Sequence, residues 1–469
     1  MTEPVPTPRP SEPSEGRRRI PEAATRRPSP LTLLAVVIPL LTVGALAVVR
    51  PAAEQPTSHD PTVAPLDRTT AVCPPQLGGA AGVRFGSTSL GSGDLTLRVG
   101  RDDDTEALVD GVASREERPA VVVGGTGELA PGLVVTRSGG GVATGCDQPS
   151  PERWFTGLGA SAEHASTLTL VNPDKGPAVA DISVWDGSGL VDAAALRGVR
   201  VPGGRSVSFD LAAVTPNRDA LAAQVVVSRG RLAASVVDTI DPLGRDKPVR
   251  EWLPSQAAPA ETSYVVGVGS ARADRVLTLA NPSDNEERVT IKLVSGDSEF
   301  APSGLEEVTL APASVTEVDL SGVLRGRTLA GVQALRIDAT GPVTASLRTR
   351  TATDLALATA GPTVASEAAV ALPAGTKKLV VAGATAPGVL VLGAWDADGQ
   401  EVVRERRVEI DAGTATRVNL PDDAVLALVS LERSSVVMSL EVTDGGVSLL
   451  PLAQLEATSQ VPDVRPAQR

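Results

Sequence analysis

The segment VRVPGGRSVSFDL, at residues 199–211, decides the fold because its pattern returns twice further along the chain. It recurs as VTLAPASVTEVDL at residues 308–320 and as VEIDAGTATRVNL at residues 408–420. In each copy apolar residues alternate with polar ones, as in a half-buried antiparallel strand, and a Pro-Gly-Gly turn divides the first copy into two strands. A pattern that repeats roughly every hundred residues predicts tandem β domains.

A second motif repeats in step with the first. LTLVNP at residues 168–173 returns as LTLANP at residues 277–282. The asparagines could serve as ligands, but their repetition favours a structural role in which Asn bonds nearby backbone where a strand becomes a turn. Short strands and units of about 100 residues favour β-sandwiches similar to immunoglobulin or fibronectin type III domains. A β-propeller is the weaker alternative, since its blades need roughly half this length.

We therefore expect an all-β protein made of tandem β-sandwich repeats behind one N-terminal transmembrane helix. In chain order, the expected parts are a disordered cytoplasmic tail (1–30), a transmembrane helix (31–49), a Pro-rich spacer (50–66), a short divergent β unit (67–150), three β-sandwich repeats (151–255, 256–365 and 366–456) and a disordered C-terminal tail (457–469). The tail at residues 1–30 is too rich in proline to bury a core.

The apolar segment at residues 31–49 predicts that everything after it lies outside the cytoplasm. It contains no charged residue, and at 1.5 Å per residue a helix of this length spans about the hydrocarbon core of a bilayer. Arginines are concentrated before it, which orients the N-terminus towards the cytoplasm. The alternative is a signal peptide cleaved after Ala45-Leu46-Ala47, which would release a secreted chain.

Composition excludes several kinds of partner. The chain carries 56 acidic and 43 basic residues, a net charge of −13, which argues against nucleic acid as a ligand. Only 2% of the residues are aromatic, so few rings are available to stack on sugars. The basic residues are mostly arginine, and together with abundant Ala, Gly and Val this is the residue usage of a GC-rich bacterial genome.

The only two cysteines, Cys73 and Cys146, both follow the apolar segment. An exported compartment permits disulfides, so we expect these two residues to be bonded to each other. A zinc site is a poor alternative, because two thiols supply half of the usual four ligands and the two histidines lie apart in sequence.

No motif predicts catalysis, a cofactor or a metal. A Gly-x-Ser-x-Gly nucleophile motif is missing from the sequence, His59 falls in the spacer, and His164 is expected at the surface of a polar loop. Residues 396–399 resemble the start of a calcium loop, but Arg407 stands where an EF-hand needs Glu. The acidic run at residues 102–104 is expected to be a solvated loop, with weak calcium binding as the alternative. The protein is therefore not expected to be an enzyme.

The tryptophans are expected to have structural roles. Trp185 and Trp395 occupy matching places in two repeats, and Val294 takes that place in the repeat between them, which favours packing over an exposed sugar platform. Trp252, at the end of its repeat, is expected at an interface between domains.

The order of these motifs resembles a known family. Cys73, Cys146, WFTG at residues 154–157 and LVNP at residues 170–173 precede a β-rich remainder. They resemble an actinobacterial family of membrane-anchored or secreted envelope proteins whose function is unknown. The resemblance implies an exported protein and supplies no activity or site residues.

Two functions remain open at this point. We expect a non-enzymatic, membrane-anchored scaffold or protein-binding protein of the bacterial cell envelope. The alternative is a carbohydrate- or peptidoglycan-binding module, with or without a cryptic hydrolase site formed by two carboxylates.

Overall fold

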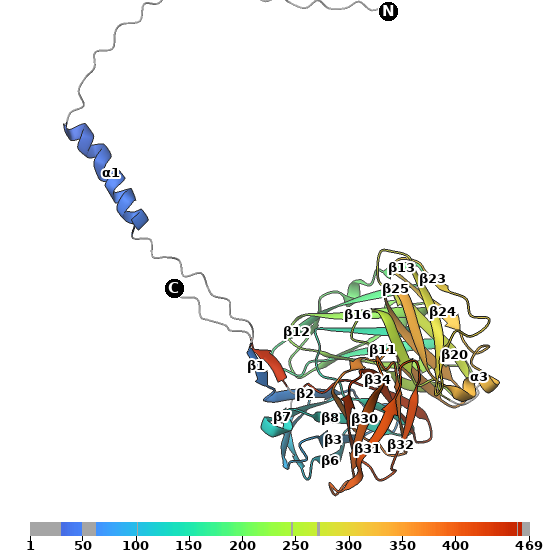
Figure 1. Cartoon of the computed structure of the whole chain (residues 1–469). Helices are drawn as coiled ribbons and strands as arrows, with labels where there is room; N and C mark the ends of the chain where they lie inside the picture. Colours follow the sequence, from blue (N-terminus) through green and yellow to red (C-terminus); the bar gives the residue numbers. More distant parts are fainter. Residues whose placement is uncertain are drawn as a thin grey trace, which may run out of the picture. The chain divides into compact units, whose positions relative to one another are not determined.

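The computed structural model describes residues 30–48, 62–100, 102–244, 247–269, 273–456 and 458–461. The chain divides into two compact units, and the larger one is Thr62–Val461. The other unit contains helix α1 (Pro30–Val48), which has Pro39 inside it (Figure 1). Across the described ranges, no helix is both long and apolar enough to cross a membrane. The predicted tail at 1–29, the spacer at 50–61 and the chain end at 462–469 lie outside the described residues.

The two ends of the larger unit form a ribbon of their own. Strand β1 (Thr62–Pro65) pairs antiparallel with β36 (Thr458–Val461), so the first and last strands lie side by side (Figure 1). The sequence predicted spacer and disordered tail here. Both segments are ordered because each supplies the backbone partner of the other.

The remaining strands follow the four predicted β segments, which we name repeats 1 to 4 (67–150, 151–255, 256–365 and 366–456). Repeat 1 has two four-stranded sheets, ordered β2-β7-β4-β5 and β6-β3-β8-β9. Its elements are β2 (Arg68–Cys73), β3 (Gly82–Ser87), β4 (Gly93–Val99), β5 (Asp102–Leu108), β6 (Val112–Glu116), β7 (Val121–Thr126), η1 (Gly127–Leu129), β8 (Leu133–Gly139) and β9 (Val142–Gly145).

Repeats 2 and 3 each form one larger, folded-over sheet. The elements of repeat 2 are β10 (Glu152–Ala160), β11 (His164–Val171), β12 (Ala178–Asp186), β13 (Gly189–Val191), η2 (Ala194–Leu196), β14 (Val199–Val201), β15 (Ser206–Asp210), α2 (Leu211–Val214), β16 (Arg218–Arg229), β17 (Ala233–Ile240) and β18 (Val249–Leu253). The elements of repeat 3 are β19 (Ala260–Val266), β20 (Asp274–Asn281), β21 (Glu287–Ser295), β22 (Glu299–Phe300), β23 (Val308–Leu310), β24 (Ser314–Asp319), α3 (Gly326–Gly331), β25 (Val332–Arg350), β26 (Leu355–Thr359) and β27 (Thr363–Val364).

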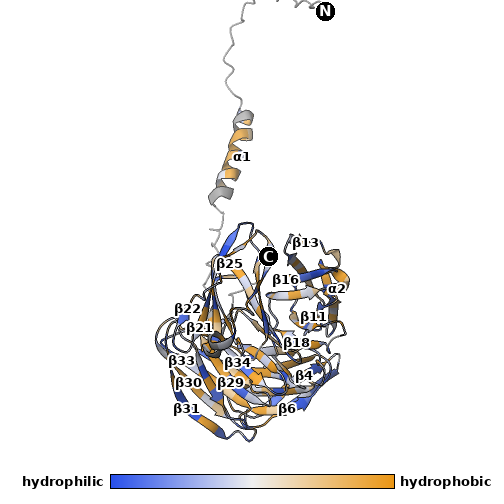
Figure 2. Ribbon diagram, turned by 90° about the vertical axis from the view of Figure 1, so that its right-hand side faces the viewer, coloured by the Kyte–Doolittle hydropathy of each residue, from blue (hydrophilic) through white to orange (hydrophobic). Residues whose placement is uncertain are grey.

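Repeat 4 again has two sheets, ordered β27-β34-β29-β32 and β28-β33-β30-β31, with β35 paired to β34. Strand β27 therefore comes from the end of repeat 3 but joins a sheet of repeat 4. The other elements are β28 (Glu367–Ala371), β29 (Thr376–Ala382), β30 (Gly388–Trp395), β31 (Glu401–Ile410), β32 (Thr416–Leu420), β33 (Leu426–Glu432), β34 (Val436–Thr443) and β35 (Val447–Leu452). The edge strand β31 is rich in exposed charge, which discourages pairing with other chains (Figure 2).

The all-β prediction is confirmed, but the strand order differs from that of an immunoglobulin domain. There the first two strands are neighbours in one sheet. In repeat 4 the first strand, β28, pairs with β33, whereas the second, β29, pairs with β34 in the other sheet. The two strands of the 199–211 motif are divided in the same way. Strand β14 pairs with β12, whereas β15 pairs with β11. The predicted turn therefore does not close a hairpin: in repeat 2 it carries the chain between the two layers of the folded-over sheet, and the equivalent turns of repeats 1 and 4 carry it between two separate sheets.

Neighbouring repeats contact each other through the same two turns at every joint, one turn from each repeat. The turn that follows the third strand of one repeat lies against the sheet-crossing turn of the following repeat, and the fourth repeat contacts the first in the same way. The contacting pairs are Gly100 with Gly204, Gly187 with Val315, Ser295 with Ala415, and Gly399 with Asp110. The four repeats therefore form a closed ring.

The strand that ends the sandwich of each repeat packs against the repeat before it, and in three of the four cases it completes that repeat's core. These strands, β9, β18, β26 and β35, also contact one another in the middle of the ring. The residues involved are Leu355 and Leu357 in the core of repeat 2, Leu449 in that of repeat 3, Ala143 in that of repeat 4, and Trp252 beside Leu77 and Ala80 of repeat 1. The cores of repeats 2, 3 and 4 therefore include residues of the next repeat around the ring, whereas the core of repeat 1 contains only its own residues.

Three of the four tryptophans, Trp154, Trp185 and Trp252, lie at joints of the ring. Trp154 and Trp185 stack with their ring centroids 5.1 Å apart, and both are buried against Val315 of repeat 3. Val294 at the matching place packs against residues of repeat 4. These residues pack between repeats rather than inside one sandwich core, and Trp252 lies at an interface as expected.

Candidate functional site

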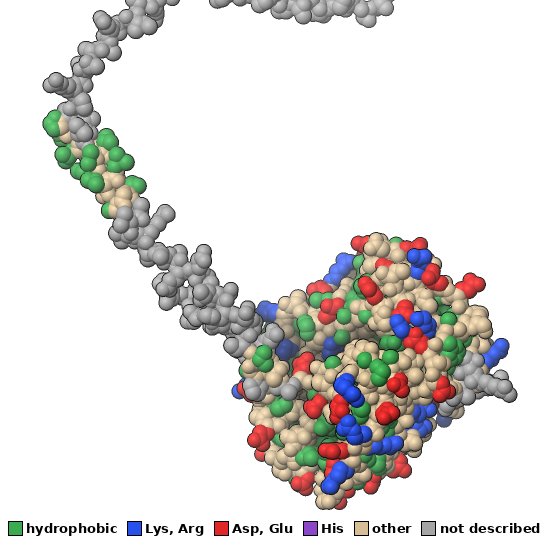
Figure 3. Space-filling model, in the orientation of Figure 1, with side chains coloured by type: hydrophobic (Ala, Val, Ile, Leu, Met, Phe, Trp, Pro, Cys, Tyr) green, Lys and Arg blue, Asp and Glu red, His purple; other side chains and the backbone are tan. Residues whose placement is uncertain are grey.

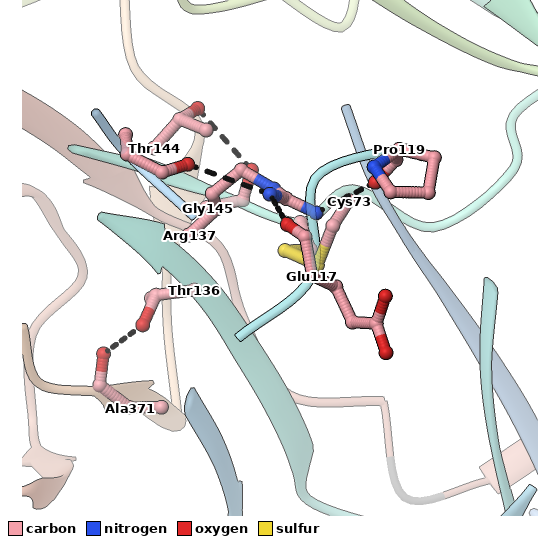
Figure 4. The surroundings of a disulfide bond; sticks show 10 residues. Cys73, Glu117, Pro119, Thr136, Arg137, Thr144, Gly145 and Ala371 are labelled. Atoms are coloured by element: carbon pink, nitrogen blue, oxygen red, sulfur yellow. Dashed lines mark hydrogen bonds between the residues drawn. A yellow bond between two sulfur atoms is a disulfide. The ribbon is translucent and has the colours of Figure 1, made fainter. Parts of the chain in front are cut away.

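Cys73 and Cys146 form the predicted disulfide (Figure 4). Cys73 ends β2 in one sheet of repeat 1, and Cys146 follows β9 at the edge of the other sheet. Their Cα atoms are 4.3 Å apart and their sequence separation is 73. The bond therefore fastens the two sheets of this repeat, which has the smallest of the four sandwich cores, to each other.

A buried guanidinium lies close to the disulfide. Arg137 of β8 is fully buried, and its Nη atoms donate to the backbone carbonyls of Glu117, Ala80 and Pro119 (Figure 4). Burial lowers the pKa of Arg137 to about 10, so the group stays protonated at neutral pH. Because its hydrogen-bond partners are backbone carbonyls, Arg137 joins backbone segments to each other and is not open to a ligand.

The prediction that His164 is a surface residue is wrong. His164 is only 7% exposed, because β11 begins at this residue rather than after the predicted loop. Its Nε2 lies 3.0 Å from each carboxylate oxygen of Asp238, and its Nδ1 lies 3.1 Å from the carbonyl oxygen of Asp219. Arg348 of repeat 3 also reaches Nδ1, so the cluster bridges two repeats.

This cluster contains Ser, His and Asp but lacks the geometry of a nucleophilic triad. A triad needs the serine hydroxyl beside the imidazole. Here Ser166 donates to Asp238 at 2.6 Å and accepts from the backbone N–H of Gly159. Ser166 and Asp238 are both fully buried. The cluster is therefore a satisfied polar core.

The two candidate calcium segments are occupied by other interactions. The acidic run lies on strand β5, not in a loop; Asp103 pairs with Arg98 and Asp104 pairs with Arg115. Hydrogen bonds from these arginines lower the pKa of both carboxyls. Asp396 accepts from two backbone N–H groups of its own turn. Over the described ranges, three or more potential metal ligands do not gather anywhere.

The repeated asparagines have the structural role that their repetition favoured. Asn172 is 1% exposed; its Nδ2 donates to the carbonyls of Gly176 and Val201, and its Oδ1 accepts from Asp174 N–H. Asn281 makes the corresponding bonds in repeat 3. Each side chain ties a turn to the sheet-crossing segment. In repeat 2, the turn so fixed forms one wall of a groove.

This groove, of about 650 Å³, lies between repeats 1 and 2. Its floor is the outer face of sheet β2-β7-β4-β5. Below the groove, Val72 and Val122 of this face pack against Val171 and Ala233 of repeat 2. Above that contact the two repeats diverge, so the upper part of the sheet face remains open.

A row of cross-strand neighbours forms the floor. Thr70 of β2 pairs with Gly124 of β7, Gly124 pairs with Thr96 of β4, and Thr96 pairs with Thr105 of β5. We call Thr70, Thr96 and Thr105 the threonine row. A Cβ on Gly124 would lie 2.4 Å from the Thr96 hydroxyl, so glycine keeps the middle of the row open.

Paired charges form the walls. On one side Arg98 donates to Asp103 at 2.5 Å and to the carbonyl of Pro173 at 2.7 Å, which ties the two repeats together. On the other side Arg231 holds Asp174 with two hydrogen bonds, of 2.6 and 3.0 Å. These pairs hold the carboxylates in place without engaging all of their acceptor positions.

The sequence model of one family matches residues 102–421. The chain belongs to DUF5719, a family of unknown function. The predicted resemblance to a family of unknown function is thereby confirmed, while the actinobacterial origin and the anchoring remain predictions. No protein with a curated description matches the chain.

The DUF5719 match covers most of the ring but not all of the groove. It begins at the first residue of β5 and ends just after β32, so Thr105, Asp174 and Arg231 lie within it. Thr70 and Thr96, like Cys73, precede it. The groove could not be predicted from the sequence, because its residues come from four strands of one repeat and two turns of another. The one feature of the sequence that could have indicated the groove is threonine on the polar face of β2 and β4. Threonine is common in exposed strands, so this feature does not indicate a site.

Proposed function

We propose that the protein is a non-enzymatic scaffold that lies outside the cytoplasm and binds another protein of the cell envelope. The observation that carries this proposal is the ring itself. Three of the four repeats take part of their core from the next repeat, and all four belong to one compact unit, so their outer faces are presented in a fixed arrangement. Acidic and basic side chains are interspersed over the face shown in Figure 3, and a rigid body with such a surface is suited to holding partners.

Two observations support placement outside the cytoplasm. The Cys73–Cys146 disulfide is of the kind that persists in oxidising compartments. The charge-free run at residues 31–49, with arginines concentrated before it, is the basis for proposing a membrane anchor. The alternative is cleavage and secretion.

Protease treatment of intact cells, followed by N-terminal sequencing of the protein, tests this placement. We expect external protease to remove residues 62–461 and the intact N-terminus to stay in the membrane fraction. A mature chain that begins at Val48 would contradict the anchor but not the export. Protection of residues 62–461 in intact cells would contradict both.

Crosslinking in intact cells followed by mass spectrometry tests the scaffold function. We expect crosslinks from exposed residues of the ring to one or a few envelope proteins. Two of the five lysines, Lys175 and Lys247, are exposed and suit an amine-reactive crosslinker. A chain that crosslinks to no other protein would count against the proposal.

Carbohydrate binding is a second candidate, and the groove between repeats 1 and 2 favours it. The same groove gives no support to a hydrolase. A glycosidase needs one carboxyl with a raised pKa to act as the general acid. In this groove the arginine partners lower the pKa of Asp103 and Asp104 instead.

A further inference from the structure

The groove between repeats 1 and 2 presents hydrogen-bonding groups in a regular array. Adjacent strands of a sheet are about 4.8 Å apart, and the threonine row crosses four of them. Thr96 and Thr105 are exposed and Thr70 is half-buried, so these hydroxyls border the groove. A threonine hydroxyl both donates and accepts, as does a sugar hydroxyl; the Thr96 hydroxyl already donates to the Gly124 carbonyl and offers the groove its acceptor positions.

We propose that this groove binds a neutral carbohydrate chain, with the threonine row beneath it and the paired carboxylates Asp103 and Asp174 beside it. The inference rests on the second candidate function and assigns it a site. Each wall carboxylate keeps acceptor positions beyond those its arginine uses. Such groups are already fixed before the ligand arrives, which reduces the entropy lost on binding.

Other occupants fit less well. An extended peptide adds to a sheet by pairing with a free strand edge. The groove instead opens over a sheet face, and β7 and β4 below it are already paired on both sides. The lining holds three aspartates and three arginines, so its charge is balanced and a polyanion would gain no net attraction there, in a chain of net charge −13. A volume of about 650 Å³ is within the usual range of small-ligand sites.

Calorimetric titration of the full chain in mild detergent tests the site. The probes are cellotetraose, chitotetraose and mannotetraose as neutral chains, and tetragalacturonate as the acidic one. We expect at least one neutral tetrasaccharide to bind and the acidic chain to bind at least tenfold more weakly. Stronger binding of tetragalacturonate would overturn the neutral ligand, and binding of no tetrasaccharide would overturn the site.

The variant Thr70→Val/Thr96→Val/Thr105→Val removes the hydroxyls and keeps side chains that suit a strand. We expect it to weaken binding at least tenfold. The matched serine variant, Thr70→Ser/Thr96→Ser/Thr105→Ser, should retain binding because it keeps the hydroxyls. Thr309→Val, an exposed threonine of β23, controls for the loss of any surface hydroxyl.

Equal affinity of the valine variant and the native chain would show that sugar binds elsewhere and would overturn the inference. If the valine variant does not fold, the serine variant still decides, because loss of binding there would contradict a role based on hydroxyls. Crosslinking to an envelope protein without any sugar binding would overturn this inference while leaving the scaffold function in place.

Discussion

Ser448 of β35 donates a hydrogen bond of 2.5 Å to the carboxylate of Glu251 on β18, although the two residues are 197 positions apart. Ser448 also accepts from the backbone N–H of Ala143 on β9. One hydroxyl thus joins repeats 1, 2 and 4 in the middle of the ring. Glu251 is 2% exposed, and its other oxygen accepts from the N–H of Trp252.

Glu251 should make the stability of the ring depend on pH. Burial raises its pKa well above the ordinary value of 4.5, and the charge of Asp354 adds to this. The unfolded chain releases this proton near pH 4.5 while the folded chain keeps it, so stability is lost as pH rises towards the raised pKa. Glu251→Gln cannot ionise. We expect the free energy of unfolding of this variant, relative to that of the native chain, to rise by up to about 1.4 kcal/mol for each pH unit above pH 4.5.

Urea unfolding at a series of pH values between 4 and 8 measures this difference. Glu306→Gln, at an exposed position, is the control and should follow the native chain at every pH. Parallel curves for the native chain and Glu251→Gln would contradict the assignment of the pH dependence to this buried carboxyl.

The disulfide should contribute substantially to the stability of repeat 1. The chain-entropy model gives about 4 kcal/mol for a closed loop of this length. Because repeat 1 is part of the ring, we expect Cys73→Ala/Cys146→Ala to lower the urea midpoint of the whole unit. Dithiothreitol should lower the midpoint of the native chain and leave that of the double variant unchanged. A double variant as stable as the native chain would show that the ring alone holds this repeat.

The strands were more predictable than their pairing. Alternation in the 199–211 motif located both β14 and β15, since period two reports which residues face a core. Which sheet each strand joins depends on partners elsewhere, β12 and β11, and alternation carries no information about them. Ring closure was unpredictable for the same reason: Leu355 and Leu357 look like ordinary core residues of their own repeat, yet they pack in the preceding one.

Buried polar groups were the least predictable part of the candidate sites. The disulfide followed from counting, because only one pairing of two cysteines exists. His164 and Asp238 are 74 residues apart, and only the register of β11 with β17 brings them together. The threonine row likewise exists only through the pairing of β2, β7, β4 and β5. The composition showed that few aromatic rings are available to stack on sugars, but it carries no information about which hydroxyls lie side by side.

Trp185 should stabilise the joint between repeats 2 and 3. Replacing a buried aromatic side chain with alanine typically costs about 3 to 5 kcal/mol, and Trp185→Ala also removes the stacking on Trp154. We expect a loss near 3 kcal/mol in urea unfolding monitored by circular dichroism. Trp395→Ala is the matched control, because Trp395 lies at the corresponding place but is only half-buried. An equal loss in the two variants would contradict a special role for the stacked pair.

The carboxylate of Asp238 should contribute more to the free energy of unfolding than an exposed ion pair does. Asp238→Ala leaves the His164 ring and the Ser166 hydroxyl without their buried acceptor, and each buried group left unpaired costs about 1 to 3 kcal/mol. Asp192→Ala removes an exposed partner of Arg197 and should cost less than about 1 kcal/mol. Adding His164→Ala to Asp238→Ala should cost less than the sum of the two single changes, because each already breaks their shared contact. Strict additivity in urea unfolding would mean that the two side chains are adjacent without being coupled.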